Sequence, residues 1–319
     1  MQSPGRRRSL SPARRIPPLI APLAALGAIL ALAACGSSTS TTSTGHSARK
    51  PSRVAPSAAT TNSSHHSTVT GAPTGKPGTT PVPVLMYHVI NPPPPTAKYP
   101  GLYVPAAEFA AQMQSLKAAG WHAVTLDQVK AYWTRGVPLG PGKPMVLTFD
   151  NGYQSQYTNA LPVLKRLGWV ADENIQLTGL PTSQGGLSDA QVKGLVDAGW
   201  ELDTQGMSHA DLITRGSSEL HYEVVTARQL LRQRYGVPVN WFCYPSGHYN
   251  AAVISEVKAA GFLGSTTVSP GWASPSQDPY RLPRVRVQGG TSPSALLDQI
   301  ASARSAPAPP DSYGGAGTS

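Results

Sequence analysis

The sequence of 319 residues has little cysteine, few acidic residues and no long unbroken apolar run, and each shortage excludes a class of protein. Its two cysteines, Cys35 and Cys243, exclude a small domain held together by several disulfides. The longest apolar run, residues 16–34, is broken by three prolines and barely reaches the ~20 residues that a membrane-spanning helix needs. A folded part of this chain therefore depends on an apolar core.

Acidic residues are absent from positions 1–80, which hold nine of the 26 basic residues. Residues 81–319 are left with 17 basic against 16 acidic residues, so the net charge of +10 belongs to the amino-terminal part. A nearly neutral folded part does not present the basic surface that nucleic acid requires. We expect no nucleic-acid partner.

Residues 1–35 have the pattern of a secretory signal. Arginines at positions 6–8, 14 and 15 precede the apolar run, which ends in Leu32-Ala33-Ala34-Cys35. A cysteine after these small residues resembles the lipobox of bacterial lipoproteins. The resemblance implies lipidation of Cys35, export, and anchoring to the outer face of the cell membrane. A plain signal peptide and a short membrane anchor are the alternatives.

The segment that follows, residues 36–80, consists largely of Ser, Thr, Gly, Pro and Ala. Such a composition cannot bury enough apolar surface to offset the entropy of ordering the chain, so we expect a disordered tether. Residues 303–319 are similar and predict a disordered tail. A single domain at residues 81–302 is then expected, long enough to bury roughly 70–75% of its unfolded surface.

Short apolar segments alternate with helical patterns throughout this domain. That alternation is typical of a parallel sheet with crossover helices, an α/β fold. The number of repeats favours a (β/α) barrel, seven-stranded and distorted or incomplete, over an open sheet. The expected strands are residues 82–88, 122–126, 144–149, 174–177, 200–202, 240–244, 262–267 and 282–287.

Polar side chains stand at the ends of several expected strands. The most informative is Val146–Gly152, in which an apolar run leads directly into Asp150 and Asn151. In parallel α/β folds the carboxyl ends of strands carry the ligand-binding and catalytic groups. Asp-Asn-Gly is also an ordinary turn sequence, so this stretch alone leaves both interpretations open.

Five segments in this order resemble the polysaccharide deacetylases, the family-four carbohydrate esterases with a NodB homology domain. The resemblance covers about residues 81–290. The segments are Val84-Leu85-Met86-Tyr87-His88, Leu147-Thr148-Phe149-Asp150-Asn151-Gly152-Tyr153, Gly199-Trp200-Glu201 through Gln205 to His209-Ala210-Asp211-Leu212, Phe242-Cys243-Tyr244-Pro245-Ser246-Gly247 and Tyr280-Arg281-Leu282-Pro283-Arg284.

The resemblance implies a metal-dependent hydrolase. In that family a divalent metal, usually zinc, is held by an aspartate and two histidines and activates a water. Carried over by position, Asp150 is the general base and His88 the general acid, and a structural histidine is the alternative for His88. The metal-ligand positions are Asn151, Gln205 and His209. Substrate-binding positions are Tyr244, Pro245 and Arg284.

Two of the three metal-ligand positions depart from the family pattern, because Asn151 replaces the aspartate and Gln205 replaces the first histidine. Neutral amide oxygens suit hard ions better than zinc, so metal binding is expected to be weak. Asp172 or Glu173 could supply a carboxylate. We expect these two residues instead to form a solvent-exposed strand start.

The leading hypothesis is an exported lipoprotein that removes N-acetyl groups from a cell-wall or extracellular polysaccharide through a metal-activated water. The alternative is a catalytically weakened or inactive deacetylase fold that binds envelope glycan in a groove lined by Tyr244 and Trp272. A purely structural envelope protein is the third hypothesis. The sequence does not choose between them.

Overall fold

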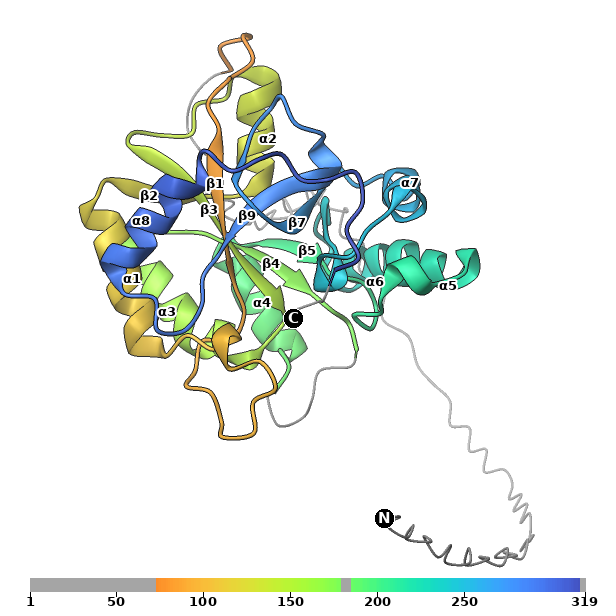
Figure 1. Ribbon diagram of the computed structural model, residues 1–319, viewed down its shortest axis with the longest axis horizontal. Helices are drawn as coiled ribbons and strands as arrows, with labels where there is room; N and C mark the ends of the chain where they lie inside the picture. The colour runs from red at the N-terminus through yellow and green to blue at the C-terminus, as the bar shows by residue number, and fades with distance from the viewer. Residues whose placement is uncertain (1–72, 179–184, 316–319) are drawn as a thin grey trace, which may run out of the picture. The chain divides into compact units, whose positions relative to one another are not determined.

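The computed structural model describes residues 73–178 and 185–315, and these form a closed α/β barrel. Seven parallel strands pair in the order β3-β4-β5-β6-β7-β9-β1, and β1 pairs back with β3 to close the ring. Helices surround the strands (Figure 1). The predicted seven-stranded barrel is confirmed. The strands are β1 (Val82–Tyr87), β2 (Trp121–Val124), β3 (Lys143–Asn151), β4 (Asp172–Ile175), β5 (Glu201–Thr204), β6 (Trp241–Cys243), β7 (Gly264–Pro270), β8 (Trp272–Ala273) and β9 (Leu282–Arg286).

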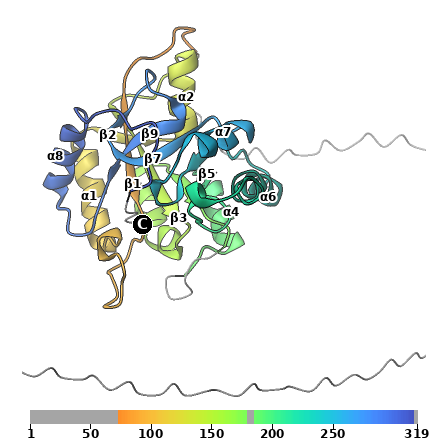
Figure 2. The same cartoon turned by 45° about the vertical axis from the view of Figure 1, so that its right-hand side comes forward.

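The helices follow the strands in the predicted alternation. They are α1 (Ala106–Ala118), α2 (Leu126–Arg135), α3 (Leu161–Leu167), α4 (Asp189–Asp197), α5 (Ser217–His221), α6 (Ala227–Tyr235), α7 (Ala251–Ala259) and α8 (Pro293–Ala303). Two π-helical segments adjoin them, η2 (Gln156–Ala160) before α3 and η5 (Tyr222–Thr226) between α5 and α6. The chain from α5 through α6 is the long helix that the sequence predicted, and Figure 2 views α6 along its axis.

Strand β3 is the centre of the sheet. Val146 pairs with Val84 of β1 and also with Val124 of β2, so β1 and β2 lie on opposite edges of β3. Further along β3, Thr148 pairs with Met86 of β1 and with Asp172 of β4. Strands β2 and β4 therefore lie end to end along one edge, and β3 carries its last residues to the barrel mouth.

The two faces of β3 have different environments because successive side chains alternate across a strand. Leu147 and Phe149 belong to an apolar layer that packs against α1, α3 and α8. Thr148 and Asp150 lie on the opposite face, inside the barrel, where both accept hydrogen bonds from Arg284 of β9. The outer layer stabilises the fold, and the inner face builds the site.

The start of β4 corrects an expectation from the sequence. All four residues of Asp172–Ile175 are buried, although we expected Asp172 and Glu173 to be exposed. Closure of the barrel explains the difference, because β4 pairs with β3 on one side and with β5 on the other.

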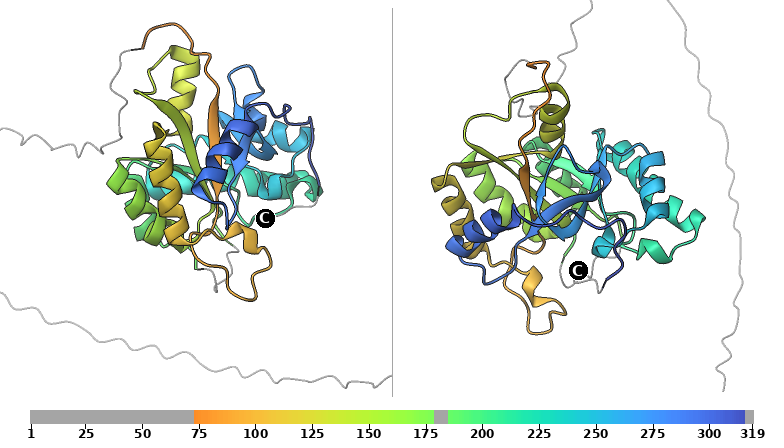
Figure 3. Two further views of the ribbon diagram at one scale, coloured as in Figure 1. Left: turned by 60° about the vertical axis from the view of Figure 1, so that its left-hand side comes forward. Right: turned by 45° about the horizontal axis from the view of Figure 1, so that its top comes forward.

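The carboxyl-terminal segment also differs from the prediction of a disordered tail. Helix α8 continues to Ala303, and residues 304–315 follow a defined path from α8 toward α7 (Figures 1 and 3). Tyr313 forms a two-residue bridge with Tyr249, through N–H···O bonds of 2.8 and 2.9 Å. This pairing gives the carboxyl-terminal segment backbone hydrogen bonds, which its composition rich in proline and alanine did not predict.

The predicted signal sequence, its Cys35 and most of the predicted tether lie outside the described residues. Among the residues that the structure does describe, no helix is long and apolar enough to cross a membrane.

Candidate functional site

An ion pair between Asp150 and Arg284 lies inside the barrel, near its mouth. Arg284 donates from Nη1 to Asp150 Oδ1 over 2.8 Å and from Nη2 to Oδ2 over 2.9 Å. Its remaining N–H groups bind Thr148 Oγ1, the Thr267 carbonyl and Cys243 Sγ. Both charged side chains are 1% exposed. All five donors of the guanidinium are thus used within the protein.

This environment keeps Asp150 ionised. Burial by itself would raise the pKa of its carboxyl. The Arg284 guanidinium lowers that pKa, and the net result is a pKa of about 2. Asn174 of β4 adds a 2.9 Å hydrogen bond to Oδ1. Because every strong partner favours the charged form, Asp150 is a carboxylate at any pH at which the domain is expected to work.

His88 follows β1 and faces the same carboxylate. Its Nε2 lies 3.8 Å from Asp150 Oδ2, while its Nδ1 is buried without a hydrogen-bond partner. Burial lowers the pKa of His88 to about 4, although Asp150 partly opposes this shift. The imidazole is therefore neutral near pH 7. His88 and Asp150 meet as the sequence predicted, and their roles as acid and base stay predictions.

Asn151 ends β3 in a left-handed conformation, with φ at 81°. Asparagine tolerates this region better than most residues, and Gly152 continues it with φ at 84°. A Cβ on Gly152 would lie 2.8 Å from Ile175 Cγ1, so the turn also needs a glycine for space. The Asn151 side chain donates to Gln176 Oε1 over 3.2 Å. The turn thus brings an amide to the edge of the mouth.

Gln205 and His209 come from the segment after β5. Gln205 Oε1 and His209 Nε2 are both buried and have no hydrogen-bond partner in the protein. Burial lowers the pKa of His209, and its backbone is left-handed with φ at 58°. Buried polar atoms without partners are uncommon in folded proteins, so these two atoms are candidates for contact with a ligand or water.

Glu223 holds the loop that carries His209. This buried residue of η5 accepts hydrogen bonds from Met207 N and Ser208 N, each over 3.0 Å, and from Ser208 Oγ over 2.5 Å. The sequence analysis missed Glu223, since nothing in its local sequence connects it to a loop 15 residues earlier. It also missed Asn174, which an amide inside an expected strand could have indicated.

The donors at the predicted metal-ligand positions do not fit the zinc site that the family resemblance implies. His209 offers one imidazole, whereas Asn151 and Gln205 offer only neutral amide oxygens. Asp150, the nearby carboxylate, has both oxygens bound to Arg284. Zinc sites in proteins are built from thiolate, imidazole and carboxylate ligands. This set has no available anionic ligand, so we derive no step through a metal at the mouth.

The predicted substrate-binding residues are buried and contact other parts of the protein. Tyr244 is fully buried, stacks on Tyr249 and donates its hydroxyl to the Tyr280 carbonyl over 2.9 Å. Pro245 is buried, and the donors of Arg284 are all engaged as described above. The structure therefore does not favour direct contact between these side chains and a substrate.

Trp272, expected to line a glycan groove, lies at the opposite end of the barrel from the mouth. Its strand, β8, pairs with Val82 and Pro83 at the start of β1, whereas His88 follows the end of β1. The prediction of a glycan groove lined by both Tyr244 and Trp272 is therefore wrong.

Comparisons with known proteins identify a matching family model and similar sequences. The family model for polysaccharide deacetylases matches residues 139–264, which run from before β3 to the start of β7 and include Asp150 and His209. The protein of Bacillus subtilis named "Putative polysaccharide deacetylase YxkH" is 29% identical over 216 residues, covering 67% of this chain and 74% of that protein. The poly-beta-1,6-N-acetyl-D-glucosamine N-deacetylase of Staphylococcus epidermidis is 26% identical over 194 residues, covering 56% of this chain and 66% of that protein.

A solved structure is similar over the barrel as well. The Streptococcus pyogenes deacetylase PplD, determined in complex with acetate, superimposes with a TM-score of 0.63 at 26% identity. The match covers 70% of this chain and 99% of that one. Similarity to these proteins supports a hydrolase in general terms. With a matching family model, similar sequences and a shared barrel, residues 139–264 are identified as a polysaccharide deacetylase domain.

Proposed function

We propose that this domain binds an N-acetylated polysaccharide at the barrel mouth and that its deacetylase chemistry is weak. The observation that carries the proposal is the set of polar groups at the mouth. Gln205 Oε1 and His209 Nε2 are buried without partners, and neither they nor Asn151 add a carboxylate. A neutral set of this kind suits hydrogen bonds to acetamide and hydroxyl groups better than it suits a catalytic metal.

A recess beside the mouth supports glycan binding. It has a volume of about 450 Å³ and includes Gly152, Ile175 and Gln176 on one side, with Arg234 and Tyr235 on the other. Ligand pockets commonly have volumes of roughly 300–1,000 Å³. Gln176 also accepts the hydrogen bond from Asn151, which connects this recess to the mouth.

The acid–base groups support slow turnover. A general base works best when its pKa is near the working pH, but the pKa of Asp150 is held at about 2. A carboxylate so tightly paired with Arg284 has little affinity for a proton from water. Without a metal to acidify that water, removal of its proton is expected to limit the rate.

A working deacetylase is the second candidate, and the intact Asp150–Arg284–His88 arrangement favours it. In that reaction the water oxygen adds to the acetamide carbonyl carbon, and the water proton passes to a base. The carbon–nitrogen bond then breaks, the amine nitrogen takes a proton, and acetate leaves. His88 Nε2 and Asp150 Oδ2, 3.8 Å apart, are close enough to contact one reacting water or amide between them.

The test compares the natural chain with an Asn151→Asp/Gln205→His variant, with each single variant as a control. Binding to a poly-N-acetylglucosamine oligomer and release of acetate are measured with added zinc and with a chelator. We expect the natural chain to bind the oligomer with little acetate release, and the double variant to gain zinc affinity and chelator-sensitive release.

Rapid, chelator-sensitive acetate release by the natural chain would overturn the weak-chemistry part and establish the second candidate. Failure of the natural chain to bind N-acetylated oligomers of glucosamine or of peptidoglycan would overturn the binding part.

We also propose that the chain is exported and lipidated at Cys35, which would place the domain next to envelope polysaccharide. The basic, apolar and small-residue segments of positions 1–35 support this.

A further inference from the structure

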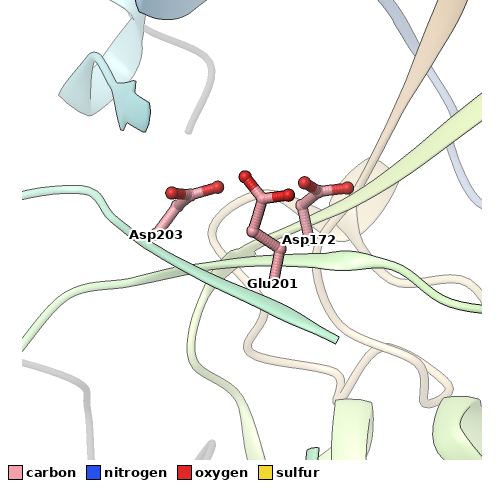
Figure 4. Close-up of side chains that lie close together, drawn as sticks. All are labelled: Asp172, Glu201 and Asp203. Carbon is pink, nitrogen blue, oxygen red and sulfur yellow. The ribbon is translucent and has the colours of Figure 1, made fainter. Parts of the chain in front are cut away.

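Three acidic side chains meet inside the barrel at the end opposite the mouth. Asp172 is the first residue of β4, and Glu201 and Asp203 are the first and third residues of β5. Asp172 pairs directly with Glu201, and one oxygen from each of the three carboxylates lies within 4.8 Å of the others. Figure 4 shows the three side chains side by side, on neighbouring strands.

Each carboxylate is oriented by backbone N–H groups. The start of α2 donates Leu126 N to Asp172 Oδ1 over 2.9 Å and Asp127 N to Glu201 Oε2 over 3.0 Å. Asp203 Oδ1 accepts from Trp241 N over 2.8 Å and from Asn240 N over 3.2 Å. Three carboxylates are therefore held in fixed positions by groups from two separate segments.

The second oxygen of each carboxylate is buried and has no hydrogen-bond partner. These atoms are Asp172 Oδ2, Glu201 Oε1 and Asp203 Oδ2. Asn174, which is not part of the acidic cluster, supplies an independent sign of a missing partner. It is 1% exposed, shares the inner face of β4 with Asp172, is paired with Asp203, and has a buried Oδ1 without a partner.

In the part of the chain that the structure describes, no ion pair neutralises this cluster, although Arg228 attracts Asp203 without pairing with it. Among the ion pairs of residues 73–178 and 185–315, none includes Asp172, Glu201 or Asp203. The start of α2 contributes roughly half a positive charge, but it also carries the Asp127 carboxylate, which repels Glu201 and Asp203. Buried carboxylates without a charged partner are strongly unfavourable, so cations or protons must neutralise them.

From this geometry we propose that Asp172, Glu201 and Asp203 bind one hard divalent cation, Mg²⁺, Ca²⁺ or Mn²⁺, inside the barrel, with Asn174 Oδ1 as a fourth oxygen donor. Oxygen-only sites built from carboxylates and a carbonyl are typical for these ions. The site is separate from the mouth and does not depend on the proposed glycan function. Asn174 Nδ2 also binds Asp150, so the cation would steady the support of that residue.

Protons are the competing occupants. Burial, together with repulsion from neighbouring carboxylates, raises the pKa of all three acids, that of Glu201 to about 8. In that case the three acids would share protons, and added metal would change nothing.

The experiment uses the full chain after treatment with a chelator. Mn²⁺ binding is measured by electron paramagnetic resonance, and the melting temperature is followed with added Mg²⁺, Ca²⁺ or Mn²⁺. The variants are Asp172→Asn and Asp203→Asn, which keep size and remove charge. Asp197→Asn, at the exposed end of α4, is the matched control, and His209→Ala removes the imidazole at the mouth.

We expect one Mn²⁺ per chain, a higher melting temperature with metal, and at least about ten-fold weaker binding in Asp172→Asn and Asp203→Asn. The control and His209→Ala should bind as the natural chain does. Absence of binding at millimolar Mn²⁺, or loss of binding only in His209→Ala, would overturn the proposal. If a variant fails to fold, crystals of the natural chain are soaked in Mn²⁺ and the anomalous-scattering peak of the metal is located. A peak between β4 and β5 supports the proposed site. A peak elsewhere, or no peak, overturns the proposal.

Discussion

At the scale of single residues, Arg284 decides what Asp150 can do. The pair is fully buried and bidentate, and the free energy of such a pair depends on both partners being present. Arg284→Met should lower the free energy of unfolding by about 3–5 kcal/mol, because it leaves Asp150 charged and unpaired. Asp150→Asn/Arg284→Met should lose less than the sum of the two single changes. Urea unfolding of the four proteins measures this coupling.

A surface pair provides the control for this cycle. Arg234 and Asp189 are 59% and 56% exposed, so Arg234→Met should cost less than about 1 kcal/mol. If the losses at Asp150 and Arg284 simply add, the two side chains do not act as a unit.

His88 gives a pH dependence at the same scale. Its pKa is about 4 in the folded chain, below its ordinary value of 6.5, because burial disfavours the imidazolium. The unfolded chain therefore binds the proton more tightly than the folded chain does. The free energy of unfolding keeps its full value above pH 6.5 and decreases as the pH falls toward 4. Between pH 7 and pH 4.5 this loss should be about 2–3 kcal/mol.

Urea unfolding at these two pH values tests the assignment, with His88→Gln as the comparison. The variant should lose clearly less stability on acidification. An equal loss in both proteins would show that another group, such as His209, whose pKa burial also lowers, accounts for the pH dependence.

At the scale of elements, the π-helical segment η5 controls the loop after β5. Glu223 of η5 accepts from two consecutive backbone N–H groups of that loop. Hydrogen bonds to a charged group are worth roughly 1.5–3 kcal/mol each. Glu223→Ala should therefore speed hydrogen exchange at Met207 and Ser208 by about 30-fold, equivalent to about 2 kcal/mol.

Glu219→Gln, one helical turn earlier and exposed, is the control and should leave exchange unchanged. Unaltered exchange in Glu223→Ala would mean that other contacts hold the loop, such as the bonds from Thr178 to the Met207 carbonyl.

At the scale of the whole molecule, the amino-terminal segment and the barrel differ in composition and in charge. The segment carries the net charge and the predicted lipidation site, while the barrel carries the polar site. If Cys35 is lipidated, Cys35→Ala should move the protein from the membrane fraction to the soluble fraction of cells. Mass spectrometry of the amino-terminal peptide checks the lipid directly, and an unmodified Cys35 in membrane-bound protein would contradict the prediction.

Local sequence was enough to predict the barrel, and it placed His88 and Asp150 at the same edge of the sheet. Alternation of apolar strands with helical patterns predicts a parallel barrel, because crossover helices must cover the strands. The position of a residue at a strand end predicts which edge it reaches, and so His88, Asp150 and Gln205 were identified before their partners were known. The sequence alone also showed that Asn151 and Gln205 replace the aspartate and the first histidine of the family pattern.

Only the tertiary structure decided which polar groups neutralise one another. Arg284 was predicted to contact substrate, but ring closure brings β9 close enough for Arg284 to bind Asp150, 134 residues earlier in the chain. Asp172 was expected to be exposed, but pairing on both edges of β4 buries it beside Glu201 and Asp203. The physical reason is the same in both cases. A residue's type and local pattern determine the element it joins, whereas its charge partner depends on strands that meet only when the barrel closes.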